Sequence, residues 1–109
     1  MTTVTYRDGK KRQEMRLIGH AGDTDVCTAI SAISQTLLWN MEREKEKGTA
    51  KVFTRMEIPG MIVIRARPGP ESRDAIRQMF RFTAEGLRMV AEEYPDNITI
   101  QEEKEHGII

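Results

Sequence analysis

The chain has 109 residues and a formal net charge of zero, with 17 basic and 17 acidic side chains. This length can bury one hydrophobic core, so we expect a single domain over residues 1–109. Balanced charge gives no long-range attraction to nucleic acid or to an anionic membrane, and no apolar run approaches the roughly 20 residues of a membrane span. The single cysteine cannot form an intrachain disulfide, and the N-terminus lacks a signal-peptide pattern. We therefore expect a cytoplasmic protein that binds neither nucleic acid directly nor a membrane.

The first residues predict two strands joined by a turn. Over residues 2–7, β-branched and aromatic side chains alternate with polar ones, which is typical of a strand with one buried face. The Asp8–Gly9 dipeptide and the basic residues after it predict a loop. An extended pattern then resumes at Met15 and ends at Gly19, where the missing side chain lets the chain bend.

From about Asp25 the hydrophobic period changes to three and four residues, which predicts a long amphipathic helix. We expect Thr24 or Asp25 to cap its N-terminus and Gly48 to end it. The mixed charges of 42–47 predict a solvated helix end.

Two strands, 50–57 and 61–67, are expected next, joined by a turn at 58–60. A second amphipathic helix follows over about 72–93 and is stopped by Pro95.

A last strand over 98–101 or a little beyond, followed by a frayed tail over 102–107, completes the predicted order ββαββαβ. This order predicts an α/β protein of the α+β type, a two-layer sandwich with a mostly antiparallel sheet and two helices on one face. Trp39 and the three phenylalanines lie in predicted elements, and we expect them to pack in the core.

Several chemistries lack the residues that they need. Two histidines and one cysteine do not make a zinc site, and there is no glycine-rich nucleotide loop. The acidic residues form no glycosidase-type pair. We therefore expect neither a metal nor a cofactor.

His20 and Cys27 are the candidate catalytic pair. Cys27 falls in the first turn of the predicted helix, where the helix dipole and unpaired N–H groups favour an anion such as a thiolate. A short loop can fold His20 back to that sulfur, giving a base beside a nucleophile. N–H groups near Cys27 and Thr28 are candidate donors for an oxyanion. Spacing alone also fits an inert buried cysteine and a surface histidine.

The same residues resemble the signature of the bacterial ribosomal-processing cysteine protease family. Gly19-His20-Ala21 matches the family's Gly-His-Ala after the second strand. A second run, Gly-x-Asp-x-Val-Cys-Ala-Ala-x-Ser, is matched by five residues here: Gly22, Val26, Cys27, Ala29 and Ser31. The likeness continues through the second predicted helix and the last strand.

The resemblance implies a homodimeric cysteine endopeptidase with His20 as general base, Cys27 as nucleophile and Ser31 as a supporting polar group. It also implies a protein substrate whose short, apolar N-terminal extension is removed, either a large-subunit ribosomal protein or a phage capsid precursor. The chain departs from the family in two ways. Its His–Cys loop is several residues shorter, and the aspartate three positions before the cysteine is Thr24, flanked by Asp23 and Asp25. The alternative function is a non-catalytic adaptor of the same fold that binds a peptide or the ribosome.

Overall fold

The computed structural model describes residues 1–57 and 60–104, and the order of its elements is ββαββαβ, as predicted. The turn expected at 58–60 and the tail expected at 102–107 therefore lie partly outside the described residues. The elements and their bounds are β1 (Thr2–Asp8), β2 (Gln13–Ile18), α1 (Thr24–Glu46), β3 (Ala50–Glu57), β4 (Met61–Pro68), α2 (Arg73–Glu93) and β5 (Ile98–Lys104).

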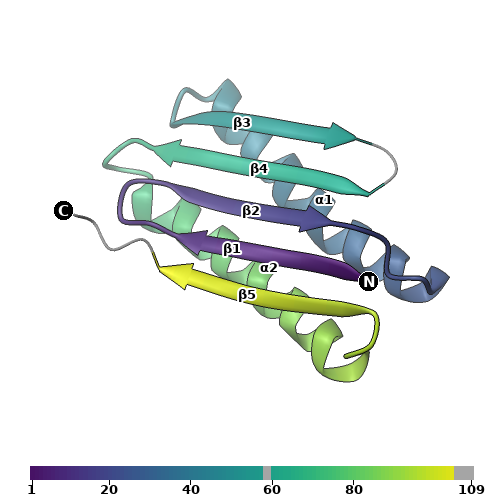
Figure 1. Ribbon diagram of the computed structural model, residues 1–109. Coiled ribbons are helices and arrows are strands. Elements are labelled where there is room, and N and C mark those ends of the chain that lie inside the picture. The colour runs from purple at the N-terminus through teal and green to yellow at the C-terminus, as the bar shows by residue number, and fades with distance from the viewer. Residues whose placement is uncertain (58–59, 105–109) are drawn as a thin grey trace.

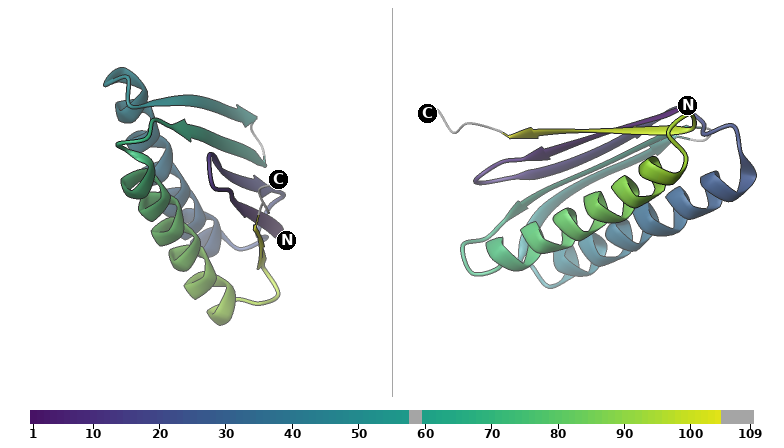
Figure 2. Two further views of the ribbon diagram at one scale, coloured as in Figure 1. Left: turned by 90° about the vertical axis from the view of Figure 1, so that its left-hand side faces the viewer. Right: turned by 90° about the horizontal axis from the view of Figure 1, so that it is seen from below.

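The five strands form one sheet in the order β3-β4-β2-β1-β5. Three neighbouring pairs are antiparallel, while β1 and β5 are parallel, so the mostly antiparallel sheet is confirmed. Both helices cover the same face of this sheet and leave the other face without helices (Figures 1 and 2). The two-layer prediction is therefore correct. Separately, no helix among the described residues is long and apolar enough to cross a membrane.

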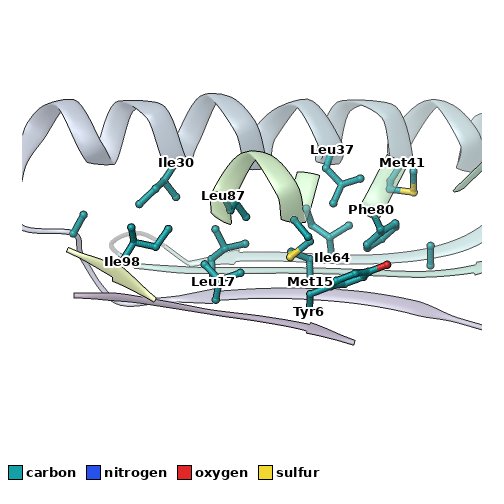
Figure 3. Close-up of a cluster of buried hydrophobic side chains, with 14 of the residues drawn as sticks. Tyr6, Met15, Leu17, Ile30, Leu37, Met41, Ile64, Phe80, Leu87 and Ile98 are labelled. Atoms are coloured by element: carbon teal, nitrogen blue, oxygen red, sulfur yellow. The ribbon is translucent and has the colours of Figure 1, made fainter. Parts of the chain in front are cut away.

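The core lies between the helices and the central strands, as Figure 3 shows. Alternation along β1 and β2 turns Val4, Tyr6, Met15 and Leu17 toward the helices, because successive side chains of a strand point to opposite faces. They meet residues that recur along the helices at spacings of three and four. The fully buried contributors from α1, β4 and α2 include Val26, Leu37, Met41, Ile64, Ile76, Phe80 and Leu87.

The expectation that Trp39 and the three phenylalanines pack in the core is wrong for three of these four residues. Phe80 is fully buried, but Trp39 and Phe82 lie on the exposed faces of the helices, 67% and 73% exposed. Phe53 is also half exposed, because β3 turns it to the face of the sheet that no helix covers, where the Arg65 guanidinium lies 5.2 Å from its ring centre. The aromatic character of a residue did not show whether it lies on the buried or the exposed face of its helix or strand.

Two further expectations are corrected at the ends of elements. Residues 102–104, expected in a frayed tail, belong to β5 because that strand pairs with β1 as far as Asp8↔Lys104. The end of α1 is not wholly solvated, since Glu44 is buried and accepts hydrogen bonds from Thr49 Oγ1 and Lys47 Nζ. The Thr49 hydrogen bond is the main cause that lowers the pKa of Glu44.

Candidate active site

The end of β2 is fixed by contacts with two neighbouring segments. Gly19 has φ +99°, which an L-residue rarely adopts, and its N–H donates to Gly60 O at 2.8 Å. Thr2 Oγ1 donates to Gly19 O at 3.3 Å. A Cβ on Gly19 would lie 2.4 Å from Met1 O, so the N-terminal strand also requires glycine at this position. His20 therefore leaves the sheet from a defined point.

The loop after His20 is held in the same way. Ala21 is buried, and its carbonyl accepts from Asn97 Nδ2 at 2.7 Å, which ties the loop to the start of β5. Asp23 then caps α1: its Oδ1 accepts from Val26 N–H at 3.1 Å. The expectation of a cap at Thr24 or Asp25 is wrong, because the helix starts at Thr24, one residue earlier than its hydrophobic period indicates.

His20 and Cys27 line the same cleft. A hollow of about 280 Å³ lies between the start of α1 and the β3–β4 end of the sheet, and a second, shallower one continues along α1. Both hollows include His20 and Cys27 in their walls. The imidazole is exposed, and the thiol is free and half-buried. Loop and helix together thus direct a potential base and a potential nucleophile into one space.

The supporting residues expected from the sequence divide into two groups. Ser31 lies on the wall of both hollows, and Thr24 and Thr28 line the second one. Thr28 Oγ1 donates to Thr24 O at 2.9 Å, so this hydroxyl is engaged within the helix. Asp25 lies in the exposed first turn and is on neither wall.

The expected oxyanion donors near Cys27 and Thr28 are not free. Cys27 N–H donates to Asp23 O at 2.9 Å, as the fourth residue of a helix does, and Thr28 lies one residue deeper in the helical ladder. Val26 N–H is bound by the Asp23 carboxylate. The correction has a simple cause: the earlier start of the helix moves the unpaired N–H groups to Thr24 and Asp25.

Several residues of the cleft were not predicted from the sequence, among them Gln35, Glu57 and Gly60. Gln35 lines both hollows, and Glu57 and Gly60 line the deeper one. Gln35 was within reach of sequence analysis, since residues spaced by four share a helix face and it follows Cys27 by twice that interval. Glu57 and Gly60 were not, because their approach depends on the pairing of β2 with β4, which ends at Ile18↔Met61.

Gly60 lies directly against the imidazole. A Cβ added there would be 3.3 Å from His20 Nε2, and φ is +96°. We expect Gly60→Ala to displace the imidazole by a few tenths of an ångström and to lower kcat/KM for peptide cleavage roughly three- to tenfold, less than the roughly hundredfold effect of a 1 Å misplacement. Gly48→Ala is the matched control: its φ is also positive, at +75°, but its Cβ would meet nothing within 4 Å. Full activity in Gly60→Ala would contradict the assignment of this contact.

No group of three or more histidine, cysteine or carboxylate side chains within residues 1–57 and 60–104 is arranged to hold a metal ion.

A model of one protein family, the cysteine protease Prp, matches residues 1–99. The chain belongs to the Prp family. The family resemblance read from the sequence is therefore confirmed, and so is the assignment to cysteine proteases, which are hydrolases. A comparison with curated proteins gives no match.

Solved structures share the fold of this Prp family member. SMU.848 from Streptococcus mutans superposes with a TM-score of 0.74 and 22% identity, covering 96% of each chain. The Staphylococcus aureus ribosomal processing protease Prp, in complex with a covalently linked product peptide, gives a TM-score of 0.69 and 20% identity over 94% of this chain and 100% of that one. The same protease with a substrate peptide gives 0.68 and 17%, with the same coverage.

Proposed function

We propose that this chain is an endopeptidase in which Cys27 is the nucleophile and His20 the general base. The observation that carries the proposal is the shared cleft, into which a strand end and a helix start direct the imidazole and the thiol. Membership of a cysteine protease family supports it. Catalytic hydrogen bonds are often long in free enzymes and tighten in the substrate complex, so the proposal does not require the imidazole and the thiol to be in contact before substrate binds.

Acylation begins when His20 takes the proton from the Cys27 thiol. The sulfur then attacks the carbonyl carbon of the scissile peptide bond, and a C–S bond forms as the carbonyl oxygen becomes an oxyanion. Collapse of this intermediate breaks the C–N bond, and the His20 imidazolium returns the proton to the leaving amine. The product with the new N-terminus departs, and a thioester remains on Cys27.

Deacylation uses the same two side chains. His20 removes a proton from water, whose oxygen attacks the thioester carbonyl carbon and forms a C–O bond. The C–S bond breaks, the thiolate leaves and takes the proton from the imidazolium, and a carboxylic acid is released. The Cys27 N–H is held by Asp23 O, so we assign the oxyanion to side-chain donors on the described cleft wall, such as the Gln35 amide and the Ser31 hydroxyl.

The cleft favours an extended segment with a bulky apolar side chain. Five of the residues that line the deeper hollow are apolar: Leu17, Ile30, Met56, Met61 and Ile62. An apolar side chain that is buried in such a pocket contributes favourable free energy. We therefore infer that the substrate is the apolar N-terminal extension of a partner protein. A large-subunit ribosomal protein is one candidate, supported by the S. aureus relative named a ribosomal processing protease; a phage capsid precursor is the other.

The test is cleavage of two peptide sets followed by capture of the acyl-enzyme. Peptides from N-terminal extensions of large-subunit ribosomal proteins and of phage capsid precursors are incubated with the full chain, and the products are identified by mass spectrometry. We expect one set to be cut beside an apolar residue, and an acid quench to reveal an acyl adduct on the Cys27 peptide. Cys27→Ser is the matched control for the thioester. Binding of both sets without cleavage would overturn the protease and favour the adaptor.

A further inference from the structure

The shallower hollow of the cleft follows the face of α1 that turns away from the core. The helix residues that line it recur at spacings of three and four, are exposed apart from the half-buried Cys27, and carry small or polar side chains: Thr24, Cys27, Thr28, Ser31, Ala32 and Gln35. Both hollows share His20, Cys27, Ser31 and Gln35, so they adjoin at the thiol. A peptide that crosses the thiol from the deeper hollow can therefore continue along α1.

A large exposed aromatic side chain lies where this row of helix residues continues. Trp39 follows Gln35 by four residues and Ala32 by seven, so the three share one face of α1. The side chains of a helix lean toward its N-terminus, which directs the indole toward the turn that Gln35 begins. Trp39 is 67% exposed, whereas tryptophan is on average well buried. Its ring is therefore available to a partner at the far end of the hollow.

The distance from the thiol to this ring matches a short stretch of extended peptide. Trp39 is 12 positions after Cys27 in the same helix, which corresponds to about 18 Å along the helix axis. An extended chain advances about 3.3 Å per residue. Because the indole leans back toward the hollow, a substrate that leaves the thiol along α1 reaches it with about its fourth to sixth residue from the scissile bond.

We propose that Trp39 is a docking residue for the substrate and contacts an apolar side chain about four to six residues from the scissile bond. The inference rests on the proposed function, in which the substrate carries an apolar extension. The deeper hollow takes the apolar side chain beside the scissile bond, and Trp39 supplies a second apolar contact beyond the shallower one. An indole offers a large contact area with only two side-chain torsions to fix. Two separated contacts make the enzyme select long extensions over short ones.

The first test compares substrates of different length. The probe is whichever extension peptide, ribosomal or capsid, the full chain cleaves, with about eight residues on each side of the scissile bond. Two truncated peptides each keep only about three residues on one side. For wild type, one truncation should leave KM unchanged, and the other should raise it about tenfold because it removes the segment that reaches Trp39.

Trp39→Ala should raise KM for the long peptide about tenfold and leave kcat unchanged, because the lost contact is made equally in the ground state and the transition state. It should change nothing for the peptide that lacks the docking segment. Trp39→Phe keeps a ring and should stay within about threefold of wild type. Phe82→Ala is the matched control: Phe82 is a 73% exposed aromatic residue of α2 that lines neither hollow, and its loss should leave KM unchanged.

The second test needs no turnover, because Trp39 is the only tryptophan of the chain. Cys27→Ala is titrated with both extension peptides and their truncations, all free of tryptophan, and the emission of Trp39 is followed. We expect a saturable blue shift as the indole leaves water, absent for the truncation that lacks the docking segment. This blue shift beside a wild type that cleaves nothing would uphold the docking and overturn the protease. Cleavage with KM and emission independent of peptide length and of Trp39→Ala would overturn the docking alone. Neither binding nor cleavage would overturn both.

Discussion

Replacing Cys27 by alanine should lower kcat/KM for the processed peptide by at least about 10³-fold, because the variant has no atom that can form the thioester. His20→Ala should lower it by about 10²- to 10⁴-fold, the usual contribution of a positioned general base. The double variant should be no worse than Cys27→Ala alone, since the two groups act as one unit. Initial rates of cleavage, followed by chromatography of the two products, measure all three.

Two controls separate lost chemistry from lost structure. Added imidazole should partly restore His20→Ala, since a free base can enter the exposed position of the missing ring, but should not restore Cys27→Ala. Thr36→Ala removes a hydroxyl that bonds only within α1, to Ala32 O, and should keep full activity. Wild-type rates in either Cys27→Ala or His20→Ala would rule out the dyad and direct attention to the adaptor.

The sequence was sufficient for the fold because local pattern and tertiary structure agree in this chain. Residues of α1 such as Ile30 and Leu37 recur at helical spacing and are buried, and β1 alternates about Val4 and Tyr6. The β1–β5 pairing was the least accessible part, since it joins residues nearly a hundred positions apart. The additional strand residues 102–104 at the end of β5 depend on that pairing and not on local propensity.

The site was predictable in its chemical groups and not in its hydrogen bonds. His20 and Cys27 were identified by position and by a family signature, and both line the cleft. The oxyanion donors were misassigned because a shift of one residue in the helix start, set by the Asp23 cap, changes which N–H groups are unpaired. Gly60 could not be predicted from the sequence, because its approach to His20 depends on the pairing of β2 with β4. The homodimer and the cytoplasmic location stay predictions.

Asp8→Asn should reduce the free energy of unfolding by about 2–3 kcal/mol, near the lower end of the loss for breaking a buried ion pair. The Asp8 side chain is 2% exposed and joins the β1–β2 hairpin to α2. It accepts from Gln13 Nε2 at 2.7 Å, from Arg77 and from Arg81 Nη1 at 2.9 Å. The two arginines are about half exposed, so water partly solvates them when the carboxylate is lost. Urea unfolding at pH 7 measures the difference.

The same carboxylate should make stability depend on pH in a defined direction. Burial alone would raise the pKa of Asp8, but hydrogen bonds from Arg77 and Gln13 and the charges of Arg77 and Arg81 outweigh it and hold that pKa below its ordinary value of 3.8. Folding therefore favours the ionised form: the stabilisation is present above pH 3.8 and is lost as pH falls through the lower folded-state pKa. The difference in the free energy of unfolding between wild type and Asp8→Asn should therefore become smaller over that acid range.

The control is Glu103→Gln, which breaks the exposed ion pair with Arg7. It should lower the free energy of unfolding by at most about 1 kcal/mol at any pH. If the difference in unfolding free energy between wild type and Asp8→Asn stayed constant down to pH 2, Asp8 would stabilise the hairpin by its packing and not by its charge.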